Sequence, residues 1–184
     1  HIKHNQLKVP KNLYKLENLE LSSCDISNVE NIYTYFNLKK LDLSCCFTES
    51  LSKEISNLKN IEDLNVSVNG LKEIPNEISE LKKLKKLHLW GNPLDRLPNS
   101  ICKIIPNKLD TQNTVYGLEY LSLPKREHSG ENFYANIPKC VSVFLEQLNS
   151  EHYHDDDQQE NNQMTMEDFL GGENPYYSDT DFCD

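Results

Sequence analysis

The sequence contains no apolar run close to the roughly 20 residues that a membrane-spanning helix needs, so we expect no membrane segment. Hydrophobic residues make up only 37% of the 184 residues, and the mean hydropathy is −0.67. Such a polar composition is unusual for a compact globule, but it suits an elongated repeat protein with a small core and much surface. The length leaves room for one domain and an appendage.

Basic residues are missing from the end of the chain. Residues 151–184 carry 11 of the 29 acidic residues and no lysine or arginine. The other 18 acids nearly balance the 19 basic residues of positions 1–150, so the net charge of −10 belongs to the tail. No basic stripe is present that could meet a phosphate backbone, and we therefore expect no nucleic-acid binding.

The tail is also rich in Gln and Asn and poor in aliphatic residues, a composition that cannot bury enough surface to offset the entropy of ordering. We therefore expect a folded domain in residues 1–150 and an acidic, disordered tail in residues 151–184. The tail could serve as a linear-motif ligand, or it could fold back over Lys40 and Lys86 and tune access to them electrostatically.

Within residues 1–150 an eleven-residue template recurs, with aliphatic residues at its positions 1, 4, 6 and 11. Its starts at residues 16, 38, 61 and 84 are spaced by 22, 23 and 23 residues. A truncated copy begins at residue 118, which implies an insertion of about 11 residues before it. Thr48 stands where the second copy should have its last aliphatic residue.

Each half of the repeat predicts one structural element. The L-x-L core alternates with period two, as a strand does. The second half, seen as I-P-N-E-I-S-E-L from Ile74 and L-P-N-S-I-C-K-I from Leu97, has helical spacing, with Pro75 and Pro98 in the first turn. Strands pack about 4.8 Å apart and helices about 8–10 Å apart, so a stack of such units curves with the sheet on its concave side.

Position 9 of the template holds Cys24, Cys46, Asn69 and Asn92. In a stack this side chain turns inward and bonds backbone groups that no strand ladder reaches, which Asn does well and Cys acceptably. Neither end of the chain shows the cysteine-rich flank of a disulfide-capped extracellular repeat domain. We therefore expect reduced thiols and a cytoplasmic or nuclear location, with a metal or disulfide role for Cys24, Cys45 and Cys46 as the lesser alternative.

These motifs make residues 7–150 resemble the leucine-rich-repeat superfamily. Repeats three and four, residues 61–104, are similar to the 23-residue intracellular class of Ras-suppressor and scribble-like proteins, with the signature L-x-x-L-x-L-x-x-N-x-L-x-x-L-P-x-x-I-x-x-L. The resemblance implies an α/β fold, a short right-handed horseshoe solenoid with a parallel concave sheet and short outer helices. It also implies binding of a protein partner, without naming one.

The ends of a solenoid need covers. We expect residues 7–16 to cover the first repeat and a helix near residues 138–149 to cap the last one, through an apolar stripe at Val141, Phe144, Leu145 and Leu148. A helix that binds a partner's groove is the alternative for this segment. The insertions near residues 106–116 and 124–135, the second with a small basic cluster at Lys125, Arg126 and His128, are expected to be solvated loops.

Side chains between the strand leucines are free to specify binding. Alternating charges at position 2 (Glu17, Lys39, Glu62, Lys85 and Glu119) are expected to pair across strands and fix register. Trp90, the only tryptophan, suits a binding hot spot, although it could instead fold over the neighbouring repeat. The residues expected to bind a partner on the concave face are Lys40, Asp42, Asp63, Asn65, Lys86, His88, Trp90 and Tyr120.

His88 near Asp63 and Asn65 could suggest acid–base chemistry, but no nucleophile, oxyanion donors or phosphate loop accompany them. We expect no enzyme activity, no cofactor and no metal site, and a monomer that acts as an adaptor or scaffold. The alternatives are a histone-binding protein, since an acidic tail after short repeats resembles the acidic leucine-rich nuclear phosphoproteins, and a secreted effector. The triplet Asn65-Val66-Ser67, a glycosylation acceptor pattern, is a weak hint toward secretion.

Overall fold

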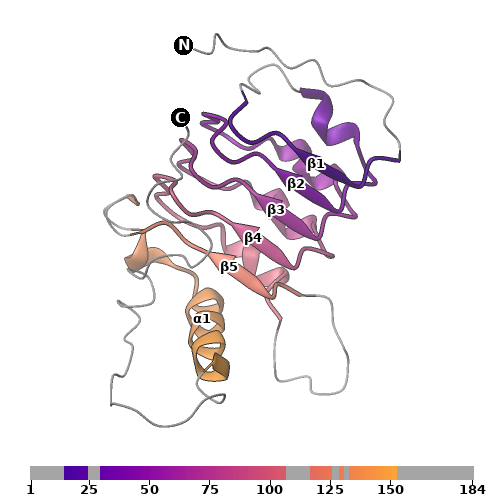
Figure 1. Cartoon of the computed structure of the whole chain (residues 1–184). Helices are drawn as coiled ribbons and strands as arrows, with labels where there is room; N and C mark the ends of the chain where they lie inside the picture. The colour runs from indigo at the N-terminus through magenta and orange to yellow at the C-terminus, as the bar shows by residue number, and fades with distance from the viewer. Residues whose placement is uncertain (1–14, 25–29, 107–116, 126–128, 131–132, 153–184) are drawn as a thin grey trace, which may run out of the picture.

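A computed structural model describes residues 15–24, 30–106, 117–125, 129–130 and 133–152. Within them a single parallel sheet carries five three-residue strands in chain order (Figure 1). The strands are β1 (Asn18–Glu20), β2 (Lys40–Asp42), β3 (Asp63–Asn65), β4 (Lys86–His88) and β5 (Tyr120–Ser122). Each begins two residues after a predicted template start, so the repeat spacing is the spacing of the strands.

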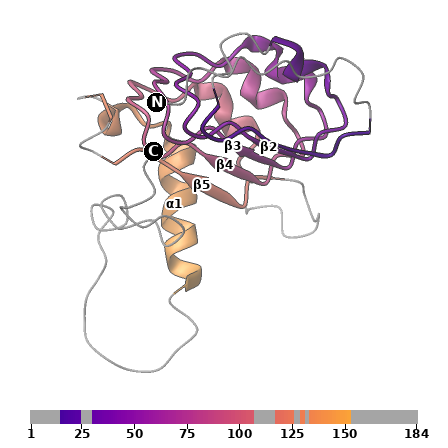
Figure 2. The same cartoon turned by 45° about the horizontal axis from the view of Figure 1, so that its top comes forward.

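Short helices cover the other side of the repeats (Figures 1 and 2). They are η1 (Glu30–Thr34), η2 (Lys53–Asn57), η3 (Asn76–Glu80) and η4 (Asn99–Lys103), all of the tight 3-10 type. Five residues are too few for a stable α-helix, whereas the 3-10 form is common in such short pieces. Pro75 and Pro98 precede η3 and η4 as N-caps, one position earlier than the predicted first turn.

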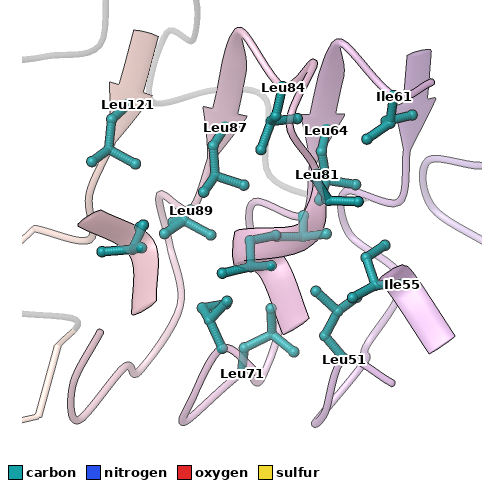
Figure 3. Packing of buried hydrophobic residues seen from close by; sticks show 14 of the residues in the cluster. Leu51, Ile55, Ile61, Leu64, Leu71, Leu81, Leu84, Leu87, Leu89 and Leu121 are labelled. Atoms are coloured by element: carbon teal, nitrogen blue, oxygen red, sulfur yellow. The ribbon is translucent and has the colours of Figure 1, made fainter. Parts of the chain in front are cut away.

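The core is a set of leucine rows that run along the stack. Residue pairing places Leu19, Leu41, Leu64, Leu87 and Leu121 side by side in neighbouring strands. Figure 3 shows Leu64, Leu87 and Leu121 pointing to the same side, toward the short helices. The middle repeats are fully closed, since strand residue Leu64 and helix residue Ile78 are both 0% exposed. The expected solenoid is confirmed.

The ninth template position works as predicted. Asn92, completely buried, donates from its side-chain amide to the carbonyl oxygens of Val66 and Leu89, each at 2.9 Å, and accepts from the Leu71 amide. The Asn69 amide group donates in the same way to the Leu43 and Val66 carbonyl oxygens. The thiol of Cys46 lies 3.0 Å from the Leu21 carbonyl oxygen, so cysteine replaces asparagine with a weaker donor.

The residue at position 8 of the template, just before this position, adopts a left-handed conformation in the first four repeats. Its φ is +59° at Ser23, +55° at Cys45, +51° at Val68 and +69° at Gly91. Glycine adopts this region without penalty, whereas a β-branched valine is strained there. A Cβ at Gly91 would lie 3.2 Å from the Val68 backbone, so a side chain there would require the neighbouring turn to shift by a few tenths of an ångström.

The last repeat is followed by η5 (Tyr134–Asn136) and by α1 (Lys139–His152), which lies beyond β5 (Figures 1 and 2). Val141, Phe144 and Leu145 are at most 3% exposed and belong to the same apolar cluster as the leucine rows. The sequence predicted a helix near residues 138–149, and α1 has bounds of 139–152. The side chain of Leu148 lies outside the described set.

A disulfide joins Cys102 in η4 to Cys140 in the first turn of α1, with their Cα atoms 5.7 Å apart. The expectation of reduced thiols is therefore wrong for this pair. Cys45 is also disulfide-bonded, so the lesser alternative holds for it. Cys24 and Cys46 are free thiols, as expected.

Several predictions fall outside the described residues: the N-terminal cover at 7–14, the insertion at 107–116, Arg126 and His128 of the basic cluster, and the tail from residue 153. In the part of the chain that is described, no helix is long and apolar enough to cross a membrane.

Candidate partner-binding face

The predicted binding residues come together on the sheet because its register is regular. One row across the strands consists of Lys40, Asp63, Lys86 and Tyr120, which are direct neighbours. A second row consists of Asp42, Asn65, His88 and Ser122. The intervening leucines point into the core, so both rows lie on the opposite, concave surface. We call the surface of these two rows, together with Glu20 and Trp90, the concave face.

An ion pair joins β1 and β2 on the concave face. The Lys40 ammonium lies 2.9 Å from Oε1 of Glu20 on the adjacent strand. This hydrogen bond is the main reason that the pKa of Lys40 is raised above its ordinary value. Both side chains are about half exposed, so the pair contributes little to stability, but it does neutralise both charges.

Asp42 is held by a local network. Its Oδ1 accepts hydrogen bonds from the Ser44 hydroxyl and the Ser44 amide at 2.6 and 2.9 Å. Its Oδ2 accepts from the Asn65 side chain at 3.0 Å, and Asn65 in turn accepts from the Ser67 amide. The sequence predicted that Asn65 would be accessible to a partner. Asn65 is only 5% exposed, so it instead supports Asp42. Nor is it a glycan acceptor in the folded domain, since its amide is buried and bonded.

Asp63, His88 and Tyr120 form the next cluster, one from each of β3, β4 and β5. Nε2 of His88 lies 3.3 Å from Oδ1 of Asp63, and the His88 ring is 4.7 Å from the Tyr120 ring, centroid to centroid. The hydrogen bond from His88 is the largest cause of the lowered pKa of Asp63, and the nearby charges of Lys86 and Lys40 act in the same direction. The cluster fixes three side chains that the sequence placed on the same surface.

Lys86 differs from the other charged residues of the concave face. It is exposed, and among the described residues its ammonium has no hydrogen bond or ion pair with any side chain. The acids of this face are each engaged by neighbours within the sheet, namely Glu20 by Lys40, Asp42 by Ser44 and Asn65, and Asp63 by His88. Lys86 is therefore the charged side chain of the concave face that has no bonded side-chain neighbour among the described residues.

Trp90 follows β4 and is half-buried, and its carbonyl oxygen accepts a hydrogen bond of 2.7 Å from the Val68 amide. The turns after the strands also present apolar groups that the sequence reasoning did not single out. Phe47 is 79% exposed, with φ of +55°, and Pro93 is exposed as well. The sequence signal was present, because Phe47 and Pro93 both occupy position 10 of the template and Val68 occupies position 8, but a turn position alone does not reveal exposure. We call Phe47, Val68, Trp90 and Pro93 the apolar edge.

The charged residues at template position 2 pair as predicted in two places. Lys39 lies 3.0 Å from Glu17, and Lys85 lies 2.8 Å from Glu62. The hydrogen bond from Lys85 is the main cause of a lowered pKa at Glu62. These exposed pairs connect neighbouring strands and so favour the correct register. No group of three or more potential metal ligands occurs among the described residues.

Comparison with known proteins agrees with this geometry. Residues 36–94 match the family model of the leucine rich repeat. Residues 36–94 are therefore leucine-rich repeats. The match covers the second and third repeats and part of the fourth, where the template is most regular. No curated protein matches the chain. The family match and the structural match indicate no enzymatic family.

Among solved structures, the leucine-rich-repeat protein LIC12759 of Leptospira interrogans is 27% identical, with a TM-score of 0.58 over 78% of this chain. The plant peptide hormone receptor RGFR1, in complex with RGF2, is 33% identical with a TM-score of 0.43 over 52% of this chain. The chain covers 33% of the first protein and 17% of the second. It thus spans a third or less of the length of these two proteins.

Proposed function

We propose that this leucine-rich-repeat domain binds a protein partner on its concave face. Domains of this fold generally serve as protein–protein interaction modules. The observation that carries the proposal is the organisation of the concave face itself. Its polar side chains are held in place by hydrogen bonds between strands, as in the Asp63–His88 pair, so a partner meets a surface that needs little further ordering.

The proposed contacts are Lys40, Asp42, Asp63, Lys86, His88, Trp90 and Tyr120. Trp90 and Tyr120 are the expected anchors, because large rigid aromatic side chains contribute most of the binding energy at many interfaces. Asn65 is left out of the contact set, since it is buried and its amide is bonded to Asp42.

The test uses a partner captured by the wild-type chain and then purified, so that affinities can be measured by calorimetry. Tyr120→Glu should weaken binding by at least about tenfold, because a charge would replace an aromatic anchor. Lys103→Glu, a charge change in the outer helix η4, is the matched control and should change affinity less than about twofold. Equal losses in the two variants, or no loss in either, would reject the concave face as the binding surface.

Trp90→Ala separates the two interpretations of this residue. If Trp90 contacts the partner, the affinity falls while the melting temperature changes little. If the ring mainly packs over the neighbouring repeat, the melting temperature falls and the affinity of the folded fraction does not. Circular dichroism melting alongside the calorimetry gives both readouts from one preparation.

We also propose an oxidising compartment for the domain, in place of the cytoplasmic or nuclear location expected from the sequence. The disulfide between Cys102 and Cys140 supports this, because such bonds persist in secreted or surface proteins and are rare in the cytosol. It favours a secreted binding protein over a histone-binding nuclear one. Alkylation of thiols during extraction from the native source, followed by peptide mass mapping, tests it: recovery of alkylated Cys102 and Cys140 would contradict the proposal.

A further inference from the structure

His88 lies on the concave face between one acidic and one aromatic neighbour. Toward β3, its Nε2 lies 3.3 Å from Oδ1 of Asp63. Toward β5, its ring lies 4.7 Å from the ring of Tyr120, centroid to centroid, and this phenol is uncharged near neutral pH. The side chains of His88 and Asp63 are 20% and 27% exposed, so the pair is already largely removed from water before a partner arrives.

The second ring nitrogen of His88, Nδ1, is the atom at which a proton can be gained. Among the described residues it has no hydrogen-bond partner, and it is not one of their buried polar atoms that lack a partner, so it reaches solvent. Nε2 faces the Asp63 carboxylate and donates to it, which leaves the proton of the charged form to be added at Nδ1. Histidine is the side chain that changes its charge between about pH 5 and pH 8.

A proton on His88 changes the charge balance of the concave face. The other charged side chains of this face are those of Glu20, Asp42, Asp63, Lys40 and Lys86. Three carboxylates and two ammonium groups leave a net charge of −1 while the imidazole is neutral, and an imidazolium brings the net charge to zero. The face is therefore easier to remove from water in the protonated form.

The same proton acts locally on Asp63, which is an anion beside a neutral imidazole and half of an ion pair beside an imidazolium. The hydrogen bond from His88 is the largest cause of the lowered pKa of Asp63, and the charges of Lys86 on β4 and Lys40 on β2 act in the same direction. Lys40 is paired with Glu20 and Lys86 is exposed, so His88 is the group in contact with the carboxylate. Burying an anion without a paired cation is costly, and a partner that covers this pair therefore favours the charged imidazole.

We propose that partner binding to the concave face is coupled to the uptake of one proton by His88, so that the domain binds more tightly in mildly acidic solution than at neutral pH. This rests on the proposed function and adds its regulation by pH. The sign follows from linkage: a complex that holds one more proton than its free components is favoured as the pH falls, and the gain is lost as the pH rises through the range in which the imidazole titrates. One proton changes Kd by at most about tenfold per pH unit.

The probe for the test is a dodecapeptide with blocked ends, selected at about pH 6.5 from a random phage library on the immobilised full-length chain. The peptide chosen contains no histidine, has no net charge and loses affinity for the Tyr120→Glu variant. Its site is then the concave face, and the titrating group belongs to the domain. Calorimetry should give an affinity about three- to tenfold higher at about pH 5.5 than at about pH 7.5, and two buffers of different ionisation enthalpy should report proton uptake. Equal affinities, a higher affinity at about pH 7.5 or proton release would overturn the proposal.

Variants assign the proton. His88→Gln keeps a donor toward Asp63 but cannot titrate, so its affinity for the peptide should be the same at both pH values. Lys103→Glu on the outer helix η4 is the matched control and should keep the full pH dependence. A pH dependence that persists in His88→Gln would assign the proton to another group and overturn the inference.

An NMR titration of the His88 ring in the wild-type chain needs no variant. The midpoint should lie at a higher pH in the peptide complex than in the free protein, and an unchanged or lower midpoint would contradict the coupling. If the peptide loses affinity for Tyr120→Glu but binds equally at both pH values, this inference fails and the concave face remains the binding surface. If Tyr120→Glu affects no selected peptide, both proposals fail.

Discussion

Removal of the disulfide between the outer helix η4 and the cap helix α1 is a perturbation whose size can be worked from the structure. The bond links Cys102 and Cys140, which are 38 residues apart. In the chain-entropy model, opening a loop of this length returns about 13 cal/mol/K to the unfolded state, or about 4 kcal/mol at about 25 °C. The double variant Cys102→Ser/Cys140→Ser should therefore unfold with a free energy about 2–4 kcal/mol lower than wild type, the range reflecting what such bonds commonly deliver.

The assay is thermal and urea unfolding followed by circular dichroism, without reducing agent. For a domain of this size 1 kcal/mol corresponds to about 2–4 °C in Tm, so the double variant should melt about 4–16 °C lower. The single variant Cys102→Ser is the control, because it breaks the same bond and should melt within a few degrees of the double variant. Wild type and double variant melting at the same temperature would refute the reasoning, since the bond would then not constrain the unfolded chain.

Three further predictions concern the repeats. Val68→Gly should raise the unfolding free energy by about 1 kcal/mol in urea titrations, because it relieves a left-handed valine, and a loss of stability would show that the Val68 side chain contributes more by packing. Asn92→Ala should lower it by about 2–4 kcal/mol, because the Leu71 amide and the carbonyls of Val66 and Leu89 lose their partner; a change below 1 kcal/mol would contradict the role of the ninth position. Asp63→Asn should flatten the acid side of the stability profile: the folded-state pKa of Asp63 is lowered from 3.8, so the wild-type carboxylate stabilises the fold above that value and the contribution is lost as pH falls through the lower folded pKa. Parallel profiles for the two proteins between pH 5 and 2 would count against the His88 hydrogen bond as its cause.

The stacking of the repeats could be predicted from the sequence because it depends on spacing alone. Leucines that recur every 22 or 23 residues can be buried together only if the strands align, and residue pairing such as Leu41 with Leu64 follows directly. The role of Asn92 was predictable for the same reason, since a turn beneath each strand must have its backbone groups satisfied. The helix type was not, because the apolar spacing of a single turn is nearly the same in 3-10 and α-helices.

The disulfide and the details of the concave face were beyond sequence reasoning. Cys102 and Cys140 are separated by insertions that interrupt the repeat register, so nothing in the spacing places one beside the other. Asn65 was expected to be accessible because it alternates with core residues. In the structure it is 5% exposed, and its side-chain amide donates a hydrogen bond to Asp42. Alternation predicts which side of the sheet a residue lies on, but not how its neighbours cover it.

Hydroxyl-radical footprinting of the purified complex tests the central claim, that the concave face binds the partner, most directly. The account predicts that oxidation of Trp90 and Tyr120 falls when the partner is bound, while Phe36 and Val143, exposed by 49% and 40% and outside the concave face, react as before. Protection of Phe36 or Val143 with unchanged reactivity at Trp90 and Tyr120 would contradict it.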